Sequence, residues 1–177
     1  MNDERMINSA RERAFDNHLN GLNCGESVFR ALLETLREAK MTELSMDIVS
    51  LATGFGGGIG SSGNTCCAII GSAMAISVIH GRKDPFDLPT PEARKNQLGG
   101  EKGLYRLYNN LVHDFKNKNG TACCAELTCP YDYYSDQRII LCRNIIAETA
   151  ASAMKWILIG IEKGYEHPFK YNIMGKK

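Results

Sequence analysis

Apolar residues recur in almost every part of this chain with the three-to-four-residue spacing of an α-helix, and alternation with period two is almost absent. This pattern predicts an all-α fold, because half-buried strands need the alternation that is missing. A length of 177 residues allows one domain with a full hydrophobic core. We therefore predict a single-domain helical bundle over 1–177, in which 164–177 is a tail. The expected helices cover residues 2–20, 24–39, 42–51, 64–81, 91–118 and 136–163.

Polar residues of the type that cap helices precede two of these segments. Asn23 stands before the helix expected from Cys24 onward, and Asn64 with Thr65 stands at the start of the helix expected over 64–81. That second helix is apolar on most sides, so we expect it to be central and buried.

Charge and hydropathy argue against several classes of partner. The formal net charge is +1 and there is no basic run, which gives no basis for binding nucleic acid or an anionic membrane. The N-terminus is charged throughout and lacks the apolar region of a signal peptide. No uninterrupted apolar stretch reaches the ~18 residues of a membrane span. We expect a cytoplasmic protein with no membrane partner.

The chain contains seven cysteines, more than a protein in a reducing compartment is expected to use for structural disulfides. Metal binding or redox chemistry is the expected reason for such a number. They are Cys24, Cys66, Cys67, Cys123, Cys124, Cys129 and Cys142.

Four cysteines are predicted to form a shared site. Cys24 and Cys66 lie at expected helix starts, where unpaired N–H groups favour the thiolate and lower the pKa of the thiol. Cys124 opens a segment that is able to form a helical turn, and Cys142 lies on the inward face of the last helix. Neighbours on a helix point ~100° apart, so only one cysteine of each adjacent pair is expected to enter the site. Periodicity does not select between them, and it gives no role to Cys123 or Cys129.

The spacing of these cysteines excludes several familiar motifs. There is no C-x-x-C pair of the zinc or thioredoxin type and no C-x-x-C-H motif for covalent haem attachment. The one medium spacing joins Cys124 to Cys129.

A glycine-rich loop leads directly into Cys66, with six glycines among residues 54–63. It satisfies the G-x-G-x-x-G pattern of dinucleotide-binding proteins, but the segment before it reads as a helix rather than as the strand that this motif needs. We interpret it as a turn between two buried helices, in which glycine allows backbone N–H groups to approach thiolates or a cluster. The residues expected to do so are Gly56, Gly57, Gly58 and Gly60.

The combination of Cys24, the loop at 54–60 and the run Thr65-Cys66-Cys67-Ala68-Ile69-Ile70-Gly71 resembles the C_GCAxxG_C_C family of redox-active proteins. The resemblance covers about residues 20–160, and the family's later cysteines correspond to Cys124 and Cys142. The chain departs from the pattern at Cys67, where we expect the family to have Gly, and at Ala125, where we expect a basic residue. This register favours Cys66 over Cys67.

The resemblance implies redox activity without specifying a reaction. A similar cysteine-bearing domain occurs in split-Soret cytochromes c, which are dimeric and carry an iron–sulfur site associated with that domain. Since the haem motif is absent here, the resemblance extends to the non-haem part alone.

Three functions follow as hypotheses. The first is an electron-transfer protein, an oxidoreductase or electron carrier, in which Cys24, Cys66, Cys124 and Cys142 bind a [2Fe–2S] or [4Fe–4S] cluster. It would need a redox partner protein, and a homodimer is one arrangement it could adopt. The second is a thiol–disulfide oxidoreductase with vicinal or paired cysteines and no cofactor. The third is a non-catalytic domain whose cysteines bind structural zinc or fill the core.

Overall fold

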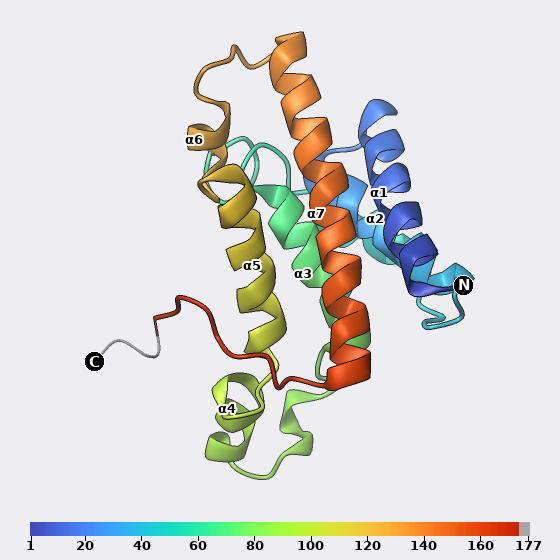
Figure 1. Ribbon diagram of the computed structural model, residues 1–177, viewed down its shortest axis with the longest axis vertical. Helices are drawn as coiled ribbons and strands as arrows, with labels where there is room; N and C mark the ends of the chain where they lie inside the picture. The colour runs from blue at the N-terminus through green and yellow to red at the C-terminus, as the bar shows by residue number, and fades with distance from the viewer. Residues whose placement is uncertain (174–177) are drawn as a thin grey trace.

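A computed structural model of the chain describes residues 1–173 and is all-α over those residues, as the periodicity predicts. No strand or sheet occurs among them (Figure 1). The helices are α1 (Asp3–Leu19), α2 (Cys24–Glu38), the 3₁₀ helix η1 (Met46–Ala52), α3 (Cys67–His80), the 3₁₀ turn η2 (Pro85–Asp87), α4 (Pro91–Gly99), α5 (Tyr105–Asn119), α6 (Cys124–Thr128) and α7 (Asp136–Lys163).

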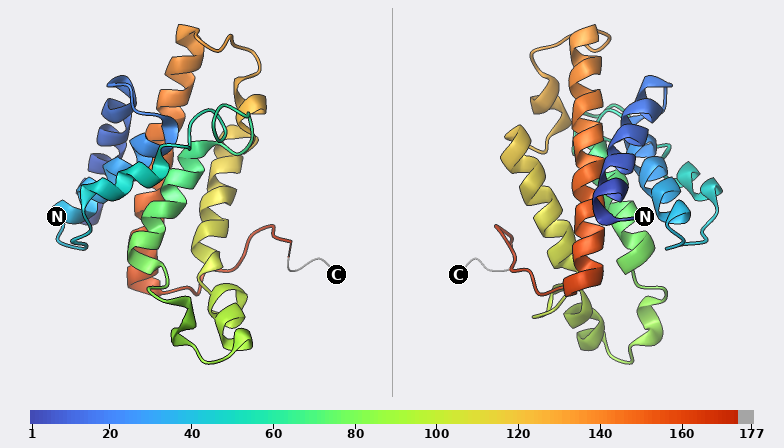
Figure 2. Two further views of the ribbon diagram at one scale, coloured as in Figure 1. Left: turned by 180° about the vertical axis from the view of Figure 1, so that it is seen from behind. Right: turned by 45° about the vertical axis from the view of Figure 1, so that its right-hand side comes forward.

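The long helix α7 forms the axis of the bundle and contacts α1, α2, α3 and α5 (Figures 1 and 2). Its bounds match the predicted 136–163, and the Ser135 hydroxyl caps it by accepting a hydrogen bond from the Arg138 N–H. By length and composition α7 could cross a membrane, but 61% of its most apolar window is buried inside the bundle. Burial against the other helices is a sufficient reason for its apolar composition.

The starts of α2 and α3 differ in how they are capped. Asn23 caps α2 as predicted, and together with Glu26 it forms a reciprocal capping box. For α3 the predicted caps are wrong: the N-cap is Cys66, and its side chain makes no capping hydrogen bond. Asn64 and Thr65 are instead extended beside a distant segment, because Thr65 forms an isolated antiparallel bridge with Cys123.

Two of the predicted helices are altered in the structure. The segment 42–51 contains only the 3₁₀ helix η1, and 91–118 is divided into α4 and α5. The division falls at Gly99 and Gly100, where the residue with the largest entropy cost in a helix occurs twice in succession. Within the predicted tail, residues 164–173 contain no helix and 174–177 lie outside the described residues.

His80, in the last turn of α3, is a buried histidine with two hydrogen-bond partners. Its Nε2 lies 2.9 Å from the Ile157 carbonyl oxygen and its Nδ1 lies 3.2 Å from the Tyr165 hydroxyl. Because a carbonyl can only accept, Nε2 carries the proton and neutral Nδ1 accepts from Tyr165. Burial lowers the pKa of His80, and burial together with the charge of Arg143 lowers that of His18.

Both histidines make folding stability depend on pH. A lowered folded-state pKa means that the unfolded chain binds the proton more readily. We therefore expect the free energy of unfolding to be largest above pH ~6.5, the ordinary histidine pKa, and to fall as the pH falls below it. Urea titrations at pH 7.5 and pH 5.5 measure this change. His80→Gln should reduce it, and an unchanged difference would remove His80 from this account.

Candidate functional site

Four helices begin or pass at one end of the bundle, and each brings a cysteine there. Cys24 is the first residue of α2, Cys67 of α3 and Cys124 of α6, while Cys142 lies in the N-terminal part of α7. Figure 2 (left) shows the loop before α3 beside α6 and the upper part of α7. All seven cysteines have free thiols.

The thiols are close enough to act on one another electrostatically. Cys24 is affected by the charges of Cys67, Cys124 and Cys142. Cys66 is affected by those of Cys24, Cys124 and Cys142. Cysteines that are far apart in the sequence therefore lie near one another at this end of the bundle, and Cys67 and Cys123 join the four that were predicted there.

A short backbone pairing joins the two segments that carry adjacent cysteines. The Cys66 N–H donates to the Ala122 carbonyl at 2.8 Å, and the Cys124 N–H donates to the Asn64 carbonyl at 2.6 Å. These bonds fix the start of α3 against the start of α6. The pairing also explains why Asn64 and Thr65 do not cap α3.

A close crossing of α2 and α3 brings Cys24 and Cys67 together. A Cβ atom on Gly71 would lie 2.5 Å from the Gly25 carbonyl oxygen, so the two backbones meet where a side chain has no room. Gly25 directly follows Cys24, and Gly71 lies one helical turn after Cys67. Gly71 thus allows α3 to approach α2 beside the first cysteines of the two helices, while Gly25 leaves room for Phe55.

The glycine-rich loop has an unusual backbone. Six of its residues have positive φ angles, which is the conformation that glycine adopts most easily. They are Gly57, Gly58, Ile59, Gly60, Ser61 and Gly63. Ile59, at φ 69°, is β-branched, and such residues rarely adopt this conformation. Backbone hydrogen bonds within the loop, such as Ser61 N–H to the Gly56 carbonyl at 2.9 Å, hold it in this shape.

Three consecutive loop residues contact three different cysteines. The Gly57 backbone N–H lies close enough to the Cys24 sulfur to lower the pKa of this thiol, although burial has the larger and opposite effect. A Cβ on Gly58 would lie 2.9 Å from the Cys124 Cβ. The Ile59 N–H donates to the Cys67 sulfur at 3.1 Å.

Of the other two predicted loop residues, Gly60 donates its N–H to the Gly54 carbonyl at 2.9 Å. Gly56 is near the Asn23 side chain, and a Cβ on Gly60 would have open space around it. Of the four glycines that the sequence suggested, Gly57 and Gly58 are therefore the ones beside the cysteines.

The expected lowering of the thiol pKa values at helix starts is wrong. Burial raises the pKa of Cys24 to about 12, and it raises that of Cys66 as well. Cys124 and Cys142 shift in the same direction for the same reason. Removing the thiolate from water and placing it near other thiolates outweighs the few N–H groups that favour it. Without a bound cation, these four thiols are protonated at neutral pH.

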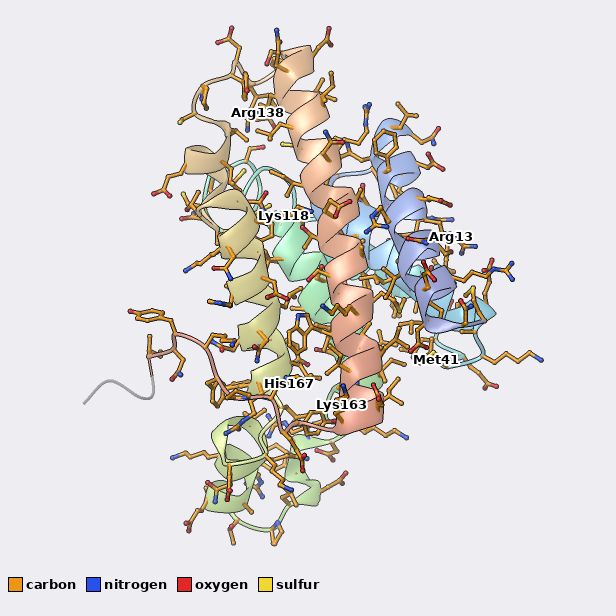
Figure 3. The ribbon with its side chains drawn as sticks, viewed as in Figure 1. Arg13, Met41, Lys118, Arg138, Lys163 and His167 are labelled. Atoms are coloured by element: carbon orange, nitrogen blue, oxygen red, sulfur yellow. The ribbon has the colours of Figure 1, made fainter. Side chains whose placement is uncertain are left out.

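Arg138 supplies a positive charge at this site, and sequence reasoning missed it. Its charge lowers the pKa of Cys124 and of Cys142, although burial is the larger effect on both. Arg138 lies near the start of α7 (Figure 3), and in the sequence of this helix it stands four residues before Cys142. The spacing of four residues on a predicted helix is the signal that could have identified it.

A single metal ion and an iron–sulfur cluster need different arrangements of cysteine ligands. Residues 1–173 contain no group of three or more Cys, His, Asp or Glu side chains arranged around a single ion. A single zinc ion requires each sulfur ~2.3 Å from one point. An iron–sulfur cluster distributes its cysteines over separate irons, so the sulfurs need not meet at one point. Thiols from four segments, of which those of Cys67 and Cys124 are buried and those of Cys24 and Cys142 half-buried, are donors of the kind that hold an iron–sulfur cluster.

Fold and site together define an all-α protein with a partly buried group of cysteines at one end of the bundle. The chain belongs to the family described as "Putative redox-active protein (C_GCAxxG_C_C)", whose pattern matches residues 22–156. A protein of Archaeoglobus fulgidus named "Uncharacterized protein" is 29% identical over 136 residues, which are 75% of this chain and 85% of that protein. No solved structure matches the chain significantly. Family membership assigns a redox role in general terms.

The letters of the family's description favour Cys67, whereas our register from the sequence favoured Cys66. The letters G-C-A-x-x-G align with residues 66–71, so that Ala68 and Gly71 match and the motif cysteine falls on Cys67. Cys66 then occupies the position of the motif's first glycine. The Ile59 hydrogen bond to the Cys67 sulfur agrees with this alignment. The departure from the family pattern therefore lies at Cys66.

Proposed function

We propose that this protein is an electron-transfer protein that binds one iron–sulfur cluster through Cys24, Cys67, Cys124 and Cys142. The observation that carries the proposal is the contact of three successive loop residues, Gly57 to Ile59, with cysteines of three different helices. When bound, such a cluster supplies one-electron transfer, and thiolates hold it. Cys67 replaces Cys66 in the ligand set that the sequence suggested.

The chain's own residues would perform three tasks. The four thiols would lose their protons on binding, because the cluster's positive irons compensate for the burial that raises the pKa values. The N–H groups of Gly57 and Ile59 would stabilise negative charge on sulfur, which favours the reduced form. Burial of Cys67 and Cys124, which are 1% and 7% exposed, would keep water away from their side of the centre.

The competing hypothesis of thiol–disulfide exchange is less well supported. Exchange needs a thiolate as the attacking group, and the best attacking thiols have a pKa near the ambient pH. The Cys24 thiol has a pKa of about 12, and the pKa of the buried Cys66 thiol is also raised. Both are therefore poor nucleophiles at neutral pH.

The physiological setting remains part of the proposal. An electron carrier needs a redox partner protein that approaches this end of the bundle, and it functions in a reducing compartment such as the cytoplasm. A homodimer is compatible with this role and is not required by it.

Cysteine footprinting tests the ligand set. Anaerobically purified protein is treated with iodoacetamide before and after iron chelation under denaturing conditions, and modified residues are located by mass spectrometry. If a cluster is bound, its four ligands should be modified only where chelator and denaturant are combined; these are Cys24, Cys67, Cys124 and Cys142. If iron was never bound, denaturant alone should be enough for them to react. The exposed Cys129 should react in every sample. Equal modification with and without iron would contradict the proposal.

A further inference from the structure

A tyrosine from the segment between α6 and α7 holds the glycine-rich loop from outside. The Tyr133 hydroxyl lies 3.1 Å from the Ser61 hydroxyl, which joins parts of the chain 72 positions apart. Ser61 adopts φ 63° within the left-handed part of the loop, and a Cβ on Gly57 would lie 2.9 Å from its Cα. Tyr133 therefore contacts the loop at the residue packed against Gly57, whose N–H faces Cys24.

The Arg138 guanidinium lies over the ring of the same tyrosine. Its guanidinium carbon lies 4.5 Å from the centroid of the Tyr133 ring, within the range of a cation–π contact. Its backbone N–H is fixed by the Ser135 cap at the start of α7. The arginine side chain is thus placed by the helix at one end and by Tyr133 at the other.

The charge of Arg138 is not neutralised by an acidic residue. No carboxylate within residues 1–173 lies at ion-pair distance from it, although Asp132 and Asp136 are near in sequence. Arg138 is half-buried beside the start of α7. A partly desolvated, unpaired cation interacts strongly with any negative charge that develops nearby. The groups able to develop that charge here are the cysteines.

From this arrangement we infer that Tyr133 and Arg138 are positioning residues that form a clamp over the cysteine centre. Tyr133 fixes the loop that directs its N–H groups at the sulfurs, and Arg138 supplies the positive charge that favours the reduced centre. The charge role rests on the proposed function, whereas the clamping of the loop by Tyr133 does not depend on bound iron.

The backbone conformation of the glycine-rich loop explains why contacts from outside are needed to hold it. Residues such as Ile59 in sparsely populated backbone conformations persist only where surrounding contacts fix them. The Tyr133–Ser61 hydrogen bond is one such contact from outside the loop. The Ala125 N–H also holds the loop from outside, at the Gly63 carbonyl, whereas Tyr133 holds it at Ser61, the residue packed against Gly57.

The charge role is tested by the midpoint potential of the iron-loaded protein. Arg138→Gln should lower the potential, because the reduced centre carries one more negative charge, and Arg138→Lys should restore most of the loss. The matched control is Arg143→Gln. Arg143 directly follows Cys142, but its guanidinium lies over the Phe15 ring and not over Tyr133. An unchanged potential in Arg138→Gln, or an equal shift in both glutamine variants, would overturn the charge role.

The clamp is tested separately by amide hydrogen exchange of the metal-free protein. Tyr133→Leu removes both the hydroxyl and the ring, and Tyr133→Phe removes the hydroxyl alone. We expect exchange at Gly57 and Ile59 to be at least several-fold faster in Tyr133→Leu and intermediate in Tyr133→Phe, with no change in α5. Native exchange rates in Tyr133→Leu would overturn the clamp. If the native protein binds no iron, the proposed function fails, while this measurement still decides the clamp.

Discussion

Replacing Gly58 with alanine should destabilise the protein and remove its capacity to bind iron. The same change at Gly60 should have a much smaller effect on both stability and iron binding. An added Cβ at Gly58 would lie 2.5 Å from the Asn64 nitrogen and 2.9 Å from the Cys124 Cβ. At φ 76° alanine would also adopt the left-handed backbone conformation, which is unfavourable for residues with a Cβ atom. Together these effects cost about 3 kcal/mol.

Gly60 provides the matched control. It lies two residues further along the same loop at φ 54°, but nothing stands within 4 Å of an added Cβ. Gly60→Ala should therefore cost only about 1 kcal/mol, the left-handed penalty alone. Urea unfolding and iron content of both variants measure the difference. Equal losses would mean that backbone conformation, and not the contact with Cys124, makes glycine necessary at residue 58.

The second large effect concerns the adjacent cysteines at the start of α3. Cys67→Ala should abolish stable iron binding, because three thiolates leave one iron without a protein ligand. Cys66→Ala should retain it. Both side chains are buried, at 1% and 8% exposure, so a general loss of packing should affect the two variants similarly.

Iron content and visible absorption after anaerobic purification distinguish the outcomes for this pair. Loss of iron in Cys66→Ala alone would restore the register that the sequence first suggested. Loss of iron in both variants would indicate that Cys66 is a ligand in addition to Cys67. Retention in both would exclude a cluster bound at the start of α3.

The helices were predictable wherever one apolar face continued without interruption. The predicted range of α7 matches the structure, and the capping box at Asn23 fixes the start of α2. Prediction failed at Gly99 and Gly100, where polar amphipathic sequence continues across a break. It also failed at Asn64 and Thr65, because their pairing with 122–125 is a long-range contact without a local signal.

Which cysteines lie near one another was easier to predict than the direction of their pKa shifts. Helix starts indicated Cys24 and Cys124, and helical periodicity indicated Cys142. The choice between Cys66 and Cys67 was not available from periodicity, because α3 is apolar on most sides. The direction of the pKa shifts was wrong, because a helix start is visible in the sequence and the depth of burial is not. Tyr133 contacts Ser61 across 72 positions, which only the fold brings together, whereas the four-residue spacing before Cys142 was the signal available for Arg138.

The most direct test of the central claim is the iron and acid-labile sulfide content of the native protein, purified without exposure to oxygen. We predict a brown protein with at least two irons per chain, an equal amount of sulfide and no stoichiometric zinc. A colourless protein without iron, whether it carries zinc or only free thiols, would contradict the claim that Cys24, Cys67, Cys124 and Cys142 bind an iron–sulfur cluster.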